Sequence, residues 1–151
     1  MMKTWLKSAA ALVLAAFATI ASADNAAEAK ALLDEAHAAV VSKGMSAAAA
    51  DFNAGGKWKR GKAYVVLVNF DGGTLLAHAD NPKLAGKAMI EARDASGKPF
   101  VQETIGNVKA KGESLVEYRW ANPTTKKIDN GRLLARRVPG QEAYVAVGFW
   151  E

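Results

Sequence analysis

Apolar residues recur at helical spacing between residues 26 and 41, near the start of the chain. The apolar positions are Ala29, Leu32, Leu33, Ala36 and Val40. Charged residues fall mostly on the other faces of such a helix. The pattern predicts an amphipathic helix that ends at Gly44, followed by a second short helix over residues 47–52 with Ser46 as its N-cap.

The hydrophobic pattern then changes to that of strands. Residues 63–70 are rich in β-branched and aromatic side chains, and the turn-forming sequence Asp71-Gly72-Gly73 separates them from a second extended run at residues 74–79. Residues 80–82, which include a proline, end the second run. The sequence therefore predicts a β-hairpin in this region.

The second half of the chain predicts one helix and three strands. Residues 83–91 are expected to form a loop with a short helical or extended piece, and the turn residues 94–99 precede a helix over residues 100–109. The strands are predicted at residues 115–121, 132–138 and 143–150. Five hairpin-linked strands with segregated helices predict an α+β domain built on an antiparallel sheet.

The first 23 residues have the features of a secretory signal peptide. Lys3 and Lys7 form a basic start, residues 9–20 are apolar, and Ala21-Ser22-Ala23 is a small-residue cleavage site. The apolar run is shorter than the roughly 18 residues that a spanning helix needs. We therefore predict a signal peptide at residues 1–23 and a single exported domain at residues 24–151, periplasmic or secreted. An uncleaved signal anchor is the alternative.

Charge and cysteine content exclude several classes of protein. Loss of Lys3 and Lys7 lowers the formal net charge from +5 to +3, and the chain has 15 acidic residues. So small an excess of positive charge argues against a nucleic-acid partner. The chain has no cysteine, which excludes disulfides, thiol catalysis, covalent haem attachment and thiolate metal sites. No metal or cofactor is predicted.

Catalytic motifs are also missing from the sequence. There is no nucleophile elbow, paired-histidine metal motif, phosphate loop or dinucleotide fingerprint. The glycine-rich segment at residues 55–61 precedes a strand instead of a helix, so its amides would not gather around a phosphate. His37 lies among alanines in the first helix and is interpreted as structural. An enzyme that uses His78 and Tyr118 is the weakest hypothesis, and we predict that the protein is not an enzyme.

Aromatic and polar residues on the predicted strands are the candidate binding residues. Tyr64 and His78 lie on the two strands of the hairpin, and Tyr118 and Trp120 share a face of the next strand. Tyrosine and tryptophan combine apolar walls with one hydrogen-bonding group, which suits a pocket for a small amphipathic molecule. Core packing is the alternative for each of them. The cations that could select an anion are Arg132, Arg93 and Lys87.

Taken in order, these elements and their intervening motifs resemble the single Cache domain. The resemblance covers residues 26–150, and its motifs are residues 50–53 (ADFN), Trp58, 61–67 (GKAYVVL), 71–78 (DGGTLLAH), 81–87 (NPKLAGK), 94–101 (DASGKPFV), 118–123 (YRWANP) and 137–140 (RVPG). It implies a PAS-like five-stranded antiparallel sheet with a long N-terminal helix packed against it. It also implies an extracytoplasmic sensor of small ligands, often short carboxylates, used in signal transduction and chemotaxis.

The resemblance implies a set of ligand-binding residues. The implied pocket wall consists of Trp58, Tyr64, His78, Tyr118 and Trp120. Many members carry a lysine after the Asn-Pro turn, and this chain has Arg132 in that neighbourhood instead. Arg132 is therefore expected to bind the carboxylate.

The predicted function is a periplasmic module that binds or senses a small molecule and acts through a partner protein. The resemblance implies a sensor kinase, a chemoreceptor or a transporter as that partner. Because Glu151 ends the chain without a signalling helix, we expect a stand-alone exported form. The N-terminal helix is a candidate for homodimer contacts. The alternative is an accessory protein-interaction subunit that has no small-molecule ligand.

Overall fold

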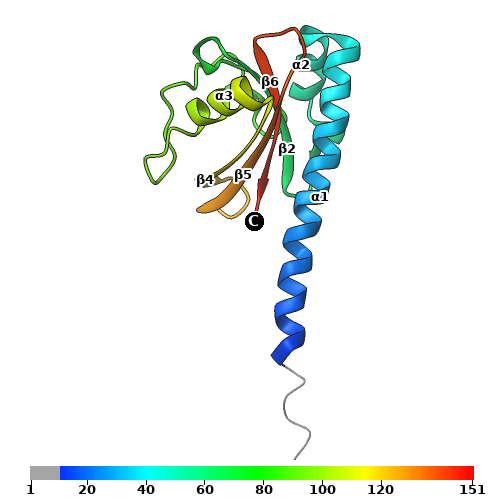
Figure 1. Ribbon diagram of the computed structural model, residues 1–151, viewed down its shortest axis with the longest axis vertical. Coiled ribbons are helices and arrows are strands. Elements are labelled where there is room, and N and C mark those ends of the chain that lie inside the picture. The colour runs from blue at the N-terminus through cyan, green and yellow to red at the C-terminus, as the bar shows by residue number, and fades with distance from the viewer. Residues whose placement is uncertain (1–10) are drawn as a thin grey trace, which may run out of the picture.

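The structure, a computed structural model, describes the backbone of residues 11–151 and the side chains of residues 24–151. The predicted signal peptide at residues 1–23 lies outside the residues whose side chains are described, so its removal stays a prediction. The first helix, α1, spans Ala11–Lys43 and extends beyond the rest of the fold (Figure 1).

Two further helices and six strands follow α1. The helices are α2 (Met45–Asn53) and α3 (Phe100–Lys111), and three short 3-10 turns lie at η1 (Gly56–Trp58), η2 (Asp71–Gly73) and η3 (Pro82–Leu84). The strands are β1 (Lys59–Arg60), β2 (Ala63–Asn69), β3 (Leu75–His78), β4 (Glu113–Asn122), β5 (Lys127–Arg137) and β6 (Ala143–Trp150). The α+β class is confirmed, and the sheet gains the two-residue strand β1 beyond the five predicted strands.

The sheet is antiparallel throughout, in the order β1-β2-β6-β5-β4, with β3 also paired to β2. The central strands β2 and β6 pair from Ala63 opposite Phe149 to Asn69 opposite Ala143. Every residue of β6 is buried, and so is nearly every residue of β2. Strands buried on both faces have continuous apolar sequences, which is the composition of these two segments.

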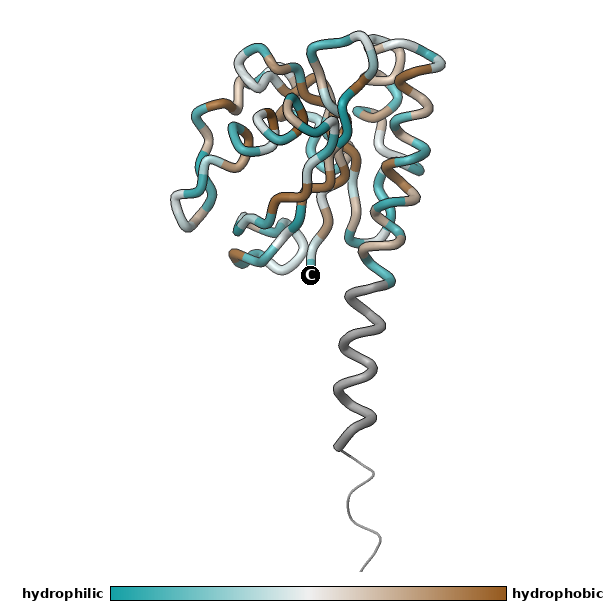
Figure 2. The backbone as a smooth tube through the Cα atoms, in the orientation of Figure 1, coloured by the Kyte–Doolittle hydropathy of each residue, from teal (hydrophilic) through white to brown (hydrophobic). Residues whose placement is uncertain are grey.

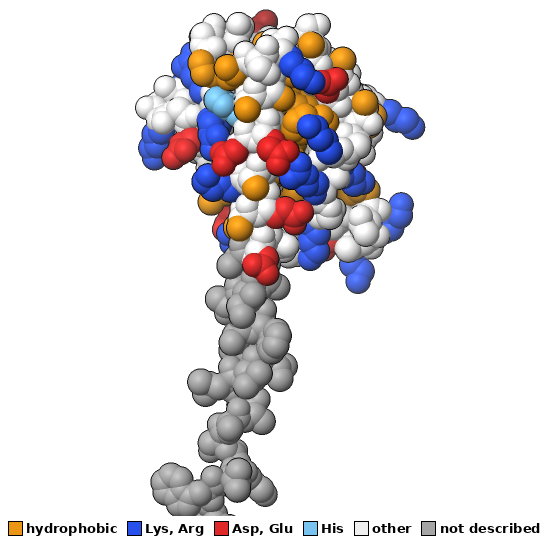
Figure 3. All heavy atoms as spheres, turned by 90° about the vertical axis from the view of Figure 1, so that its right-hand side faces the viewer, with side chains coloured by type: hydrophobic (Ala, Val, Ile, Leu, Met, Phe, Trp, Pro, Cys, Tyr) orange, Lys and Arg blue, Asp and Glu red, His pale blue; other side chains and the backbone are white. Residues whose placement is uncertain are grey.

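Helix α1 covers one face of the sheet, over β2, β6 and β5. Its stripe of Leu32, Leu33, Ala36 and Val40 is almost fully buried, as the helical spacing predicted. Figure 2 shows hydrophobic and hydrophilic residues alternating along this part of α1 and hydrophobic residues concentrated in the strands. Basic and acidic side chains are interspersed on the outward face of α1 (Figure 3). The helix is thus amphipathic, with its apolar stripe on the sheet.

Polar contacts join α1 to the edges of that face. Arg136 of β5 donates to Asp34 at 2.8 Å, and Arg60 of β1 donates to both carboxylate oxygens of Glu35 at 3.2 and 2.6 Å. A ring nitrogen of His37 lies 3.0 Å from the carbonyl oxygen of Arg137. His37 therefore makes a structural contact.

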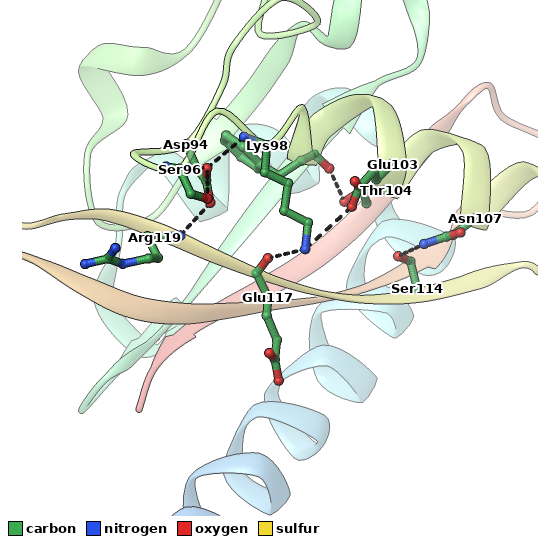
Figure 4. A network of polar contacts seen from close by, with 10 residues as sticks. Asp94, Ser96, Lys98, Glu103, Thr104, Asn107, Ser114, Glu117 and Arg119 are labelled. Atoms are coloured by element: carbon green, nitrogen blue, oxygen red, sulfur yellow. Dashed lines mark hydrogen bonds and ion pairs between the residues drawn. The ribbon is translucent and has the colours of Figure 1, made fainter.

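Helix α3 lies on the opposite face, next to β4 and β5, and a loop before it runs along the outer edge of β4. The Asp94 carboxylate of this loop accepts hydrogen bonds from the backbone amides of Ser96, Lys98 and Arg119, each at 2.9 Å, and from the Ser96 hydroxyl at 2.7 Å (Figure 4). The Ala95 amide donates to the Arg119 carbonyl at 3.0 Å. The loop thus covers part of a strand edge that would otherwise be unpaired.

Two local predictions are wrong. Ser46 does not cap α2, because the helix begins two residues earlier than predicted, at Met45, and Gly44 occupies the N-cap position with φ 88°. Strand β5 begins at Lys127, not at residue 132, because it pairs with β4 as far as Asn122. The first residues of β5 are mostly polar and exposed, so hydrophobicity did not reveal them.

Candidate ligand-binding site

A cavity of about 340 Å³ lies on the face of the sheet opposite α1. Strands β2, β4, β5 and β6 supply its floor, and α3, β3 and the connection between β3 and α3 supply its other walls. Its size falls in the usual range of small-molecule sites. Four of the six predicted binding residues line it: Tyr64, His78, Tyr118 and Trp120.

Two tyrosines meet across the floor of the cavity. Tyr64 on β2 pairs with Gly148 on β6, and a Cβ atom at Gly148 would lie 2.6 Å from the Tyr64 ring. The absent side chain therefore leaves room for the ring to lie over β6. The Tyr64 hydroxyl reaches the Tyr118 hydroxyl of β4 at 2.9 Å. This bond joins strands that are three places apart in the sheet.

His78 lies against Tyr64 at one side of the cavity. The two rings are stacked, with centroids 4.9 Å apart. His78 Nδ1 accepts the Asn81 amide at 2.9 Å, so the neutral ring carries its proton on Nε2. Burial lowers the pKa of His78, which keeps the ring neutral near pH 7. The Nε2–H group has no hydrogen-bond partner among the described residues and is available as a donor.

Phe100 forms part of the opposite wall of the cavity. It is the first residue of α3, stacks on Tyr118 with centroids 4.9 Å apart, and meets Trp120 edge-to-face at 5.4 Å. Asn107 of α3 donates to the Ser114 hydroxyl of β4 at 3.1 Å, which ties this helix to the strand that carries the two aromatic residues (Figure 4). The wall is therefore built from rings that support one another.

The hydroxyl groups in the cavity are protonated at neutral pH. Burial raises the pKa of Tyr64, Tyr118 and Tyr144, all of which line the cavity. A protonated phenol both donates and accepts a hydrogen bond. The cavity thus offers a ligand three neutral hydroxyls and one imidazole N–H.

The charged lining of the cavity is acidic. Asp80 is the one carboxylate among the lining residues, and no lysine or arginine of the described chain is among them. The Asp80 side chain is 11% exposed and forms an ion pair with Lys59, whose own side chain is 51% exposed. The cavity wall therefore holds a carboxylate whose partner lies toward solvent.

Arg132, the cation expected to bind a carboxylate, does not line this cavity. Arg132 contacts Glu151 at 2.7 Å and Glu117 at 3.4 Å, whereas its neighbour Leu133 lines the cavity. Successive residues of a strand point to opposite faces of the sheet, so Arg132 belongs to the other face of β5.

The remaining candidates also lie outside the cavity. Trp58 packs edge-to-face on Phe52 of α2 with centroids 4.8 Å apart, so its indole is part of the core. Arg93 donates to the Gly97 carbonyl at 3.1 Å, and Lys87 is exposed. None of Trp58, Arg93 and Lys87 contributes to the cavity wall.

Several cavity residues were missed at the level of the sequence. They are Asp80, Phe100, Leu133, Tyr144 and Trp150. Tyr144, Gly148 and Trp150 have the same parity on β6, and this alternation is a signal that could have placed them together. Nothing in the sequence pattern marked Asp80 or Phe100, because the first follows a strand and the second begins a helix.

A sheet with a long N-terminal helix on one face and a cavity on the other has the architecture of a PAS-like domain. The sequence profile described as Cache domain matches residues 14–151, and the chain therefore belongs to the Cache domain family.

Solved structures of chemotaxis proteins share the fold. A periplasmic sensor domain of a chemotaxis protein matches with a TM-score of 0.62 and 21% identity, over 93% of this chain and 99% of that one. A methyl-accepting chemotaxis protein from Vibrio parahaemolyticus matches with a TM-score of 0.69 and 19% identity, over 93% and 97% of the two chains. A Cache chemosensory domain studied for carboxylic acid recognition matches with a TM-score of 0.63 and 18% identity, over 94% and 99%.

Among curated proteins, no relative matches the chain significantly. Within the part of the chain that the structure describes, no helix has both the length and the hydrophobicity to cross a membrane.

Proposed function

We propose that this Cache domain is an extracytoplasmic module that binds a small molecule in the cavity between the sheet and α3. The observation that carries the proposal is the cavity itself, whose aromatic walls surround neutral hydrogen-bonding groups. Membership of the Cache family supports a sensory role. The proposed location is the periplasm or the exterior of the cell, as the predicted signal peptide suggests.

The proposed binding residues are those that line the cavity. Tyr64, Tyr118 and Trp120 would contact the ligand through their rings, and His78 would donate a hydrogen bond from Nε2. Phe100 would position Tyr118 and Trp120 through its two ring contacts. Trp58 and Arg132 are not part of this proposed site.

The size of the cavity limits the ligand. Its 340 Å³ corresponds to about eleven times the liquid volume of one water, so the ligand has roughly ten non-hydrogen atoms or fewer. The sequence predicted a short carboxylate, but a carboxylate in this cavity would find no lysine or arginine on the described walls. We therefore propose a largely apolar molecule with one or two hydrogen-bonding groups.

Ligand binding is proposed to be relayed to a signalling or transport protein. The fold shared with chemotaxis sensor domains supports a chemoreceptor or a sensor kinase as the receiving protein. A homodimer through α1 stays a prediction from the sequence.

Thermal unfolding with a panel of small alcohols, amines and carboxylates tests the proposal. A ligand at a hundred times its Kd stabilises the folded state by about 2.7 kcal/mol, which raises the Tm on the order of 10 °C for a domain of this size. Trp120→Ala should abolish the rise. Arg132→Ala, on the other face of the sheet, should retain it.

A panel in which no compound raises the Tm would contradict the proposal and favour an accessory protein-interaction subunit. If Arg132→Ala loses the ligand response and Trp120→Ala retains it, the ligand binds on the α1 face of the sheet and not in the cavity.

A further inference from the structure

The electrostatic character of the cavity selects against anions. Asp80 supplies its one carboxylate, and no lysine or arginine lies on its described walls. The imidazole of His78 adds no charge near pH 7, because burial lowers its pKa. An anionic ligand would therefore face a carboxylate, and no lysine or arginine on the cavity walls would pair with it, because Lys59, the partner of Asp80, lies toward solvent. Loss of hydration without such a partner is unfavourable.

Asp80 is placed to act on a ligand in the cavity. Its side chain is nearly nine-tenths buried, and its Oδ1 atom pairs with Lys59. Among the described residues, Lys59 is the one ion-pair partner of this carboxylate. Burial and the neighbouring Tyr118 raise the pKa of Tyr64, and the charge of Asp80 adds to the increase, in agreement with its place on the cavity wall.

Six aromatic residues line the walls of the cavity. The rings belong to Tyr64, Phe100, Tyr118, Trp120, Tyr144 and Trp150. The face of an aromatic ring carries negative potential, and ammonium groups bind against such faces most strongly where water is excluded. A buried carboxylate beside several aromatic rings is a combination that favours a positively charged organic ligand.

We propose that the cavity binds an organic monocation, an amine or a quaternary ammonium of roughly ten non-hydrogen atoms or fewer, with its charge near Asp80 and its carbon atoms against the aromatic rings. This rests on the proposed function of small-molecule binding. Lys59 acts as a competitor, because its half-exposed ammonium group occupies the carboxylate from the solvent side.

Isothermal calorimetry with molecules of similar shape and different charge tests this assignment. One series is choline, its neutral analogue 3,3-dimethylbutan-1-ol, and 3,3-dimethylbutanoate. The other is 2-phenylethylammonium, 2-phenylethanol and phenylacetate. In a series that fits the cavity, we expect the ammonium compound to bind at least tenfold tighter than the alcohol and the carboxylate to bind most weakly.

If an alcohol or a carboxylate binds as tightly as the ammonium compound, the proposal of a monocationic ligand is wrong, but the proposed small-molecule function is unaffected. Failure of all six compounds would also overturn it, and the function itself would fall only if the broader thermal panel gave no ligand.

The two members of the ion pair provide opposite tests. Asp80→Asn should weaken binding of the ammonium compound at least tenfold and change the affinity for the alcohol by less than threefold. Lys59→Gln should strengthen binding of the ammonium compound, because the carboxylate loses its competing partner. If the ion pair were purely structural, both substitutions would change the affinity for the ammonium compound in the same direction.

Unchanged ammonium affinity in a folded Asp80→Asn protein would overturn the proposal. If Asp80→Asn does not fold, Lys59→Gln decides alone, since unchanged or weaker ammonium binding in that variant contradicts competition for Asp80.

Discussion

Gly148 determines how Tyr64 can lie in the cavity. The two residues are opposite each other on β6 and β2, and the Tyr64 ring occupies the space where a side chain at Gly148 would begin. Because the ring lies over β6, its hydroxyl reaches Tyr118. A single missing Cβ thus permits the polar contact at the floor of the cavity.

Gly148→Ala is expected to displace the Tyr64 ring and destabilise the protein by about 1–3 kcal/mol, as overpacking of a buried site usually does. Urea denaturation measures the change. Gly106→Ala is the matched control, since the added Cβ would meet no atom within 4 Å and alanine is favoured over glycine in a helix such as α3 by up to about 1 kcal/mol. If Gly148→Ala and the native protein are equally stable, the Tyr64 ring can move without a loss of stability, contrary to this expectation.

The Asp94 carboxylate organises the loop before α3 and links it to the edge of β4. Although burial raises the pKa of the Asp94 carboxyl, hydrogen bonds from Ser96, Arg119 and Lys98 outweigh it and hold that pKa well below its usual range. Arg119 lies between Tyr118 and Trp120 on β4, so the same bonds position the strand segment that carries two cavity residues. The loop and the cavity wall are therefore one structural unit.

Asp94→Ala is expected to lower the free energy of unfolding by about 2 kcal/mol or more at pH 7, because it removes charge-assisted hydrogen bonds and leaves buried amides unpaired. Chemical denaturation measures the loss. Asp51→Ala is the control, since Asp51 makes an exposed ion pair with Lys43 that contributes at most about 1 kcal/mol.

The effect of Asp94 should also depend on pH. Its pKa is lower in the folded state than the ordinary value of 3.8, so its stabilisation is complete above that value and is lost as the pH falls toward the folded-state pKa. The stability difference between the native protein and Asp94→Ala should therefore shrink below about pH 4. A difference that stays constant from pH 7 to pH 3 would contradict the carboxylate as its source.

Most secondary-structure elements could be predicted because their signals are local. The helical spacing before Gly44 and the alternation in β4 identify those elements directly. Strand β5 was predicted too short because its first residues are polar and depend on pairing with β4 across the turn. Pairing of this kind is a contact between strands, and a single strand's composition does not reveal it.

At the scale of the whole molecule, the two faces of the sheet differ in how they are packed. The face under α1 is filled by apolar side chains and bordered by ion pairs, whereas the face under α3 retains a cavity. Helix α1 therefore stabilises the sheet without entering the candidate site. Substitutions in α1 should change stability and leave the cavity residues in place.

Leu33→Ala is expected to destabilise the protein by about 2–5 kcal/mol, because Leu33 is 1% exposed in the contact between α1 and the sheet. Arg136→Ala, which removes the partly exposed ion pair with Asp34, should lower stability by about 1 kcal/mol or less. Thermal or urea denaturation of the two variants measures both effects. A larger loss in Arg136→Ala than in Leu33→Ala would show that ion pairs, and not apolar burial, hold the helix.

The sequence by itself determined most of the elements, the α+β class and four residues of the candidate site, because hydrophobic periodicity and turn chemistry act over a few residues. Only the tertiary structure decided that Asp80, Phe100 and Tyr144 join those four while Arg132 lies on the opposite face of the sheet. Cavity membership depends on the order and register in which distant strands pair. A shift of one residue along β5 would put Arg132 in the place of Leu133 and replace an apolar part of the cavity wall with a cation.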